Sequence, residues 1–144
     1  MKKEKRYVRS ARDAVSLLER YAHSRQERFG IICLDSGCRV IGVKCLFIGS
    51  SNKCMVDPKM VFWEACRKQA SAIILFHNHP SWNCTPSDED KDLTRAIRDG
   101  GKLLNIQILD HVIVAPGEHY SFLENEAVTM EDEDYLIRSG KKEK

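Results

Sequence analysis

Apolar residues recur at helical spacing in three segments of the chain, and each segment follows a residue that is favoured at helix N-caps. Ser10 precedes the first segment, Asp57 the second and Ser87 the third. A proline directly after Asp57 is typical of a first helical turn. The pattern therefore predicts three helices, at 11–22, 58–70 and 88–99, and a Gly-Gly pair at 100–101 is expected to end the last one.

Short and almost continuously apolar runs lie between these segments, and such runs are typical of buried strands. The predicted strands are 28–35, 40–49, 70–79, 104–108, 110–114 and 120–122. Only a tight turn separates the first two, so we expect them to form an antiparallel hairpin. Helices alternate with the later strands, which is typical of a sheet that is covered on both faces. The sequence thus predicts an α/β fold with three α/β/α layers and a mixed sheet.

The chain of 144 residues suits one domain, which we place at 10–124, between a basic tail at 1–9 and a charged tail at 125–144. A composition with 42% hydrophobic and 31% charged residues is that of a globular protein, and a net charge of +2 argues neither for nor against nucleic acid. No apolar run approaches the roughly 20 residues that cross a bilayer, and no apolar stretch follows the basic N-terminus. We therefore expect a cytoplasmic protein that does not bind membranes.

The six cysteines form no C-x-x-C pair, so the sequence supports neither a thiolate zinc knuckle nor a thioredoxin-type motif. Three of them fall inside apolar patterns, where buried and reduced thiols are expected. Cys84 differs, because it lies inside the polar stretch HNHPSWNCTPSDED at 77–90.

This stretch carries the candidate chemistry of the chain. His77 and His79 stand two residues apart at the end of a predicted strand, so their side chains share one face and their Cβ atoms lie about 6.5–7 Å apart. Two imidazoles placed in this way can bind one ion at about 2.0–2.1 Å. Asp90 follows in the first turn of the next predicted helix and supplies a third ligand. Three protein ligands with one open position are typical of a catalytic zinc ion, whereas four ligands are typical of a structural one.

Hydrolysis at such a site also needs a general base, and Glu27, just before the first strand, is the best candidate. The hydroxyl of Ser87 is a candidate partner for an oxyanion. Simpler interpretations stay open. Ser87 and Asp90 also fit a capping box, and a histidine at a strand end is often structural.

The strings HNHP and TPS, followed by Asp90, resemble the metal motif of the JAB/MPN (JAMM) metalloproteases, and more closely the RadC branch. The resemblance includes 25–35, 49–65 and 109–114, and it covers 10–124. It implies a cytidine-deaminase-like α/β/α fold and a zinc site.

In that site, the resemblance makes His77, His79 and Asp90 the zinc ligands. Glu27 would be the general acid and base, and Ser87 the oxyanion partner. It also places Asp110 and His111 either around the site or in buried structural roles.

Two positions depart from the RadC pattern. Trp82 stands where the branch usually has glycine, and a tryptophan would be costly there if the backbone takes a positive φ. Cys84 stands where proline is usual, and as a fourth ligand it would close the zinc site.

The resemblance implies a zinc-dependent hydrolase of amide or isopeptide bonds. Its partner would be a protein or peptide substrate, which includes conjugates of ubiquitin-like modifiers. The alternative is a DNA repair accessory or DNA-binding module without peptidase activity, since the RadC branch carries a DNA-repair name. A nucleobase deaminase is disfavoured, because the H-x-E and P-C-x-x-C patterns are absent. The oligomeric state stays open.

Overall fold

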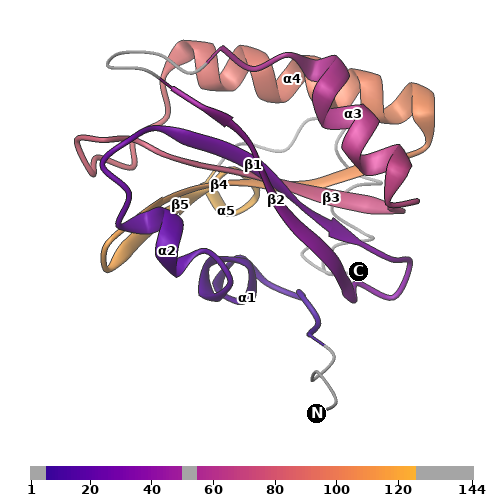
Figure 1. Ribbon diagram of the computed structural model, residues 1–144, viewed down its shortest axis with the longest axis horizontal. Helices are drawn as coiled ribbons and strands as arrows, with labels where there is room; N and C mark the ends of the chain where they lie inside the picture. Colours follow the sequence, from indigo (N-terminus) through magenta and orange to yellow (C-terminus); the bar gives the residue numbers. More distant parts are fainter. Residues whose placement is uncertain (1–5, 50–54, 126–144) are drawn as a thin grey trace.

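A computed structural model describes residues 6–49 and 55–125 of the chain. Its centre is a mixed five-stranded sheet in the order β2-β1-β3-β4-β5 (Figure 1). The strands are β1 (Arg28–Leu34), β2 (Val40–Ile48), β3 (Ala72–Asn78), β4 (Gln107–Ala115) and β5 (Glu118–Ser121). Strands β3 and β4 are parallel, and the other neighbouring pairs are antiparallel. The predicted hairpin of the first two strands is confirmed.

Helices cover both faces of this sheet, as Figure 1 shows. They are α1 (Ala11–Ser16), α2 (Glu19–Ala22), α3 (Pro58–Arg67), α4 (Asp88–Leu104) and the short α5 (Phe122–Asn125). One apolar cluster joins α1 and α2 to the sheet, and a second joins α3 and α4 to its opposite face. The three-layer α/β/α arrangement predicted from the sequence is therefore confirmed.

The first predicted helix is two helices, and the prediction of one continuous helix over 11–22 was wrong. The amides of Leu17 and Leu18 donate to the carbonyl oxygens of Ala14 and Val15, at 3.0 and 2.9 Å, so each bond spans three residues rather than four. This tighter turn redirects the chain. Leu18, at the break, is fully buried against the sheet.

The end of α4 also differs from the prediction, because the helix passes through both glycines to Leu104 and is capped by Asn105, whose φ is 58°. Gly101 is needed for another reason. A Cβ atom at this position would lie 2.4 Å from the carbonyl oxygen of Ile106, where the chain turns back. The two strands predicted next are one strand, β4, with an irregular register near Leu109 that explains the interrupted pattern.

Part of the predicted N-terminal tail pairs with the sheet. Tyr7 forms an isolated bridge with Arg39, and the amide of Val8 donates to the carbonyl oxygen of Cys38 at 2.9 Å. Val8 is buried. Residues 1–5 and 126–144, which make up most of both predicted tails, lie outside the described residues. In the part of the chain that the structure describes, no helix combines the length and the apolar character that a membrane span requires.

Candidate metal centre

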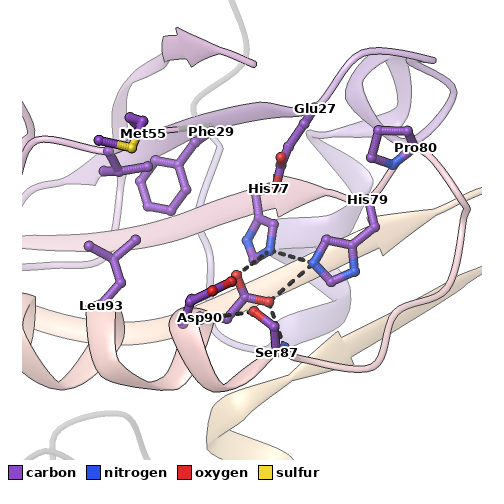
Figure 2. Close-up of a pocket in the computed structure, with 11 residues that line it drawn as sticks. Glu27, Phe29, Met55, His77, His79, Pro80, Ser87, Asp90 and Leu93 are labelled. Carbon is purple, nitrogen blue, oxygen red and sulfur yellow. Dashed lines mark hydrogen bonds and ion pairs between the residues drawn. The ribbon is translucent and has the colours of Figure 1, made fainter. Parts of the chain in front are cut away.

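The two histidines of the stretch at 77–90 meet at the end of β3. His77 is the next-to-last residue of this strand and His79 follows it directly, so both side chains lie on one face. Their Nε2 atoms are 2.9 Å apart. His77 is 2% exposed and its ring stacks against Phe29 on the neighbouring strand β1, with ring centroids 5.9 Å apart. Figure 2 shows both imidazoles directed toward the start of α4.

Asp90 comes to the histidines from the first turn of α4. Its Oδ1 atom lies 3.2 Å from Nε2 of His77, and its Oδ2 atom lies 3.1 Å from Nε2 of His79. Burial alone would raise the pKa of Asp90, but hydrogen bonds with the two histidines outweigh burial and hold the pKa well below its usual range. The carboxylate is therefore ionised and faces both imidazoles.

Ser87 holds Asp90 in place through a capping box at the start of α4. The amide of Asp90 donates to Oγ of Ser87 at 3.0 Å, and the amide of Ser87 donates to Oδ2 of Asp90 at 2.8 Å. The capping interpretation of these residues is thus confirmed. The Ser87 hydroxyl accepts in this bond, which leaves its own proton for another acceptor at the exposed mouth of the site.

Glu27 reaches the same place from the segment before β1. One carboxylate oxygen of Glu27 and one nitrogen from each of His77 and His79 all lie within 4.8 Å of one another. The backbone of Glu27 is anchored by Gly49, whose amide donates to its carbonyl oxygen at 2.7 Å. Glu27 is half-buried and lines the same pocket as His77, His79 and Asp90.

Asn78 is a positioning residue that the sequence reasoning did not identify. It points away from the histidines on β3 and is fully buried. Its Oδ1 accepts from the amide of Arg28 at 2.8 Å, and its Nδ2 donates to the carbonyl oxygens of Ser24 and Gln26 at 2.9 and 3.0 Å. These bonds fix the loop that carries Glu27. The sequence places an asparagine between two ligands, but only the strand pairing shows what it holds.

These side chains open into a pocket of about 500 Å³, a volume that suits a small ligand or a short peptide segment. Glu27, His77, His79, Ser87 and Asp90 all line it. Apolar side chains of Phe29, Met55 and Leu93 gather on one side of the histidines, as Figure 2 shows. The pocket therefore joins a polar centre to an apolar wall.

The donor atoms in this centre fit a divalent cation such as zinc. Two imidazole nitrogens and two carboxylate oxygens converge within about hydrogen-bond distance. Lone pairs that face one another repel, so a proton or a metal cation has to lie among them. Imidazole and carboxylate are ligands that zinc accepts, and no soft thiolate is present in the group.

His111 lies directly behind His77, in the fully buried layer below the pocket. Nε2 of His111 is 2.7 Å from Nδ1 of His77, and Nδ1 of His111 is 2.5 Å from Oγ1 of Thr94. Burial, followed by the nearby charge of His77, holds the pKa of His111 well below its usual range. Thr94 is a contact that the sequence reasoning missed, because a threonine inside a helix carries no signal of its partner.

Asp110 faces away from the metal centre. Its Oδ1 accepts from the amide of His111 at 2.7 Å and from the amide of Leu123 at 3.0 Å, and its Oδ2 accepts from the hydroxyl of Ser121 at 2.6 Å. Burial raises the pKa of Asp110 despite these bonds. Of the neighbouring pair at 110–111, His111 thus contacts the site, and Asp110 organises the turn from β5 into α5.

Cys84 does not belong to the metal centre, so the possibility that it closes the site as a fourth ligand was wrong. It is buried in a separate apolar cluster with Ile113, Ala115 and Phe122. Burial, together with the nearby Glu118, raises the pKa of its thiol to about 11. The candidate metal group among the described residues contains no cysteine.

Comparison with known proteins agrees with this geometry. Residues 8–127 match the family described as RadC-like JAB domain. A UPF0758 protein of Desulfitobacterium hafniense is 40% identical over 118 residues, which is 81% of this chain and 52% of the relative. A UPF0758 protein of Symbiobacterium thermophilum is 41% identical over 113 residues, which is 78% of this chain and 48% of the relative.

The chain spans about half the length of these curated relatives. The match includes the strands, the helix α4 and all of the residues that line the metal centre. The chain belongs to the RadC-like JAB domain family.

Proposed function

We propose that this chain is a zinc-dependent hydrolase, a metallopeptidase that cleaves amide or isopeptide bonds. The observation that carries this proposal is the convergence of two imidazole nitrogens on one aspartate, with a glutamate carboxylate in the same pocket. Membership of the RadC-like JAB domain family supports it. The proposal also places the protein in the cytoplasm.

His77, His79 and Asp90 would hold the zinc ion, because their donor atoms already point to one place. When bound, zinc would supply a Lewis acid for the scissile carbonyl and lower the pKa of water at its open position. The three ligands come from the end of one strand and the capped start of one helix. Such rigid elements suit a site that must keep its geometry during a reaction.

Glu27 would act as general base and then as general acid. Its carboxylate lies near both histidines but is tethered to neither by a hydrogen bond that the structure describes, so it can accept a proton from water and pass it to the leaving amine. Ser87 would donate its remaining hydroxyl proton to the oxyanion. The apolar wall would receive apolar atoms beside the carbonyl, which suits a protein or peptide substrate, conjugates of ubiquitin-like modifiers among them.

The test combines metal content with turnover. Protein purified without chelators or a histidine tag should contain about one zinc ion per chain by mass spectrometry, because the site offers three ligands to one ion. Glu27→Gln should keep the zinc and lower hydrolysis of peptide and isopeptide-linked substrates by at least ~10²-fold, since it removes only the base. Glu19→Gln, the same change at an exposed site, serves as the matched control.

Full activity in Glu27→Gln would remove Glu27 from this role. A chain that takes up no zinc, even when zinc is supplied, would rule out the hydrolase. Such a result would favour the DNA repair accessory or DNA-binding module, which predicts DNA binding that weakens steeply as salt is raised.

A further inference from the structure

A continuous series of hydrogen bonds runs behind the metal centre and begins and ends on two of its proposed ligands. Nδ1 of His77 contacts Nε2 of His111 at 2.7 Å, and Nδ1 of His111 contacts Oγ1 of Thr94 at 2.5 Å. The Thr94 hydroxyl lies 2.8 Å from the backbone carbonyl oxygen of Asp90. The series therefore joins β3, β4 and α4, the three elements below the pocket.

The positions of the protons in this series follow from the chemistry of its two ends. When His77 uses Nε2 as a ligand, its single proton lies on Nδ1 and must be donated to Nε2 of His111. Because Nε2 of His111 accepts this proton, the proton of the His111 ring lies on Nδ1 and is donated to Oγ1 of Thr94. Thr94 in turn needs an acceptor for its hydroxyl proton.

The carbonyl oxygen of Asp90 is that acceptor, because a carbonyl oxygen can only accept. Every donor in the series then has an acceptor, and every acceptor has a donor. In the reverse arrangement, the Thr94 hydroxyl would donate to Nδ1 of His111, and the carbonyl oxygen of Asp90 would receive no proton from Thr94. That arrangement would put the His111 proton on Nε2, leave Nδ1 of His77 without a proton, and place the His77 proton on Nε2, where it blocks the ligand atom.

We propose that Thr94 and His111 are positioning residues that hold His77 in the tautomer whose Nε2 lone pair faces the metal centre. This inference rests on the proposed zinc site. It assigns to Asp90 two connected contributions, the carboxylate that faces the histidines and the carbonyl oxygen that ends the series. It also explains why a histidine is buried between Phe29 and Phe122, whose rings both pack on His111.

The test is a pair of substitutions at one position. Thr94→Val keeps the shape of the side chain but removes the acceptor for the Nδ1 proton of His111, and we expect zinc affinity to fall by about 10–100-fold in competition with a zinc-chelating dye. Thr94→Ser keeps the hydroxyl and should restore the affinity to within about threefold. His111→Phe should lower the affinity as much as Thr94→Val, because His77 then loses its acceptor.

Histidine tautomers provide a readout that a merely structural role would not change. In ¹⁵N spectra of the metal-free wild-type protein, His77 and His111 should both carry a proton on Nδ1, and in metal-free Thr94→Val this signature of His111 should be lost. Ile97→Val, a buried change on the same helix, controls for general loss of stability and should change neither readout.

The possible outcomes separate this inference from the proposed function. Unchanged zinc affinity and unchanged tautomers in Thr94→Val would overturn the inference and leave the hydrolase intact. Zinc binding that depends on Thr94, without any hydrolysis, would support the inference and count against the hydrolase. A wild-type chain without zinc would overturn both.

Discussion

The main-chain amide of Trp82 donates to the carbonyl oxygen of His79 at 2.8 Å, and Trp82 takes a left-handed backbone conformation with φ of 63°. The turn that leads away from the proposed ligand His79 is thus closed by a residue in a conformation that favours glycine. The family resemblance places glycine at this position, and the positive φ gives the physical reason. The protein tolerates tryptophan here at a conformational cost.

Glycine at position 82 should therefore stabilise the fold more than alanine does. Trp82→Gly and Trp82→Ala both remove the indole, so the difference between them isolates the backbone. We expect Trp82→Gly to be more stable by about 1 kcal/mol in urea unfolding, because only glycine adopts a positive φ without strain. Ser81 serves as the control, because it is not among the residues with positive φ. At this position the Ser81→Ala variant should be more stable than Ser81→Gly. An equal stability of the two variants at position 82 would contradict this account.

Gly30 in β1 should tolerate no side chain. A Cβ atom there would lie 2.2 Å from the carbonyl oxygen of Lys44 and 2.5 Å from the ring of Phe76. Since one of these contacts is backbone of the neighbouring strand, we expect Gly30→Ala to lower the free energy of unfolding by about 3 kcal/mol or more. The measurement is urea unfolding followed by circular dichroism.

Gly42 in β2 provides the matched control for this prediction. The nearest atoms to a Cβ at position 42 belong to the flexible side chain of Lys68, at 3.4 Å or more. Gly42→Ala should therefore change stability by less than about 1 kcal/mol. If Gly30→Ala and Gly42→Ala lowered the free energy of unfolding by similar amounts, the close approach of β1 and β2 would not be the reason for glycine at position 30.

The cysteines should differ in their reaction with iodoacetamide. Burial raises the pKa of the thiols of Cys33 and Cys84 to about 11, so few of them are thiolates at pH 8, and both side chains are shielded from the reagent. Cys66 is exposed and should react before Cys33 and Cys84. Peptide mass spectrometry of the native protein measures the order, and labelling in urea confirms that every thiol can react. Rapid labelling of Cys84 in the folded protein would contradict its place in the apolar cluster.

The stability of the metal-free protein should depend on pH through Asp90 and His79. The hydrogen bonds that outweigh burial lower the pKa of Asp90, so its contribution is present above about pH 3.9 and is lost as the pH falls below it. The hydrogen bond with Asp90, opposed by burial, raises the pKa of His79. The contribution of His79 to folding stability is therefore present below about pH 6.5, and it is lost as the pH rises through the raised pKa. The pair should thus stabilise the metal-free fold most between about pH 4 and 6.5.

The difference in unfolding free energy between wild type and Asp90→Asn, measured without metal from pH 3 to 9, checks this window. Zinc affinity should instead fall as the pH drops through this window, because the imidazoles must lose protons before they bind metal. A difference that stays constant across the whole range would mean that the two side chains do not interact in the metal-free protein.

Much of this site was predictable because its spacing is local. Residues two apart on a strand share a face, so His77 and His79 had to point the same way once β3 was recognised. Ser87 and Asp90 are three residues apart at a helix start, where a capping box forms from neighbouring groups alone. The strands and most helix starts followed from the same short-range patterns.

The remaining features depend on contacts between segments far apart in the chain. Glu27 reaches the histidines because β1 pairs with β3 and Asn78 holds the preceding loop, and Thr94 meets His111 because α4 packs over β4. These contacts depend on how two apolar clusters pack on the two faces of the sheet. The spacing of residues within one segment does not determine that packing. The sequence alone therefore specifies the types and the spacing of the proposed ligands. Packing across the sheet determines where Glu27 lies, and it brings Thr94 and His111 behind the proposed ligands.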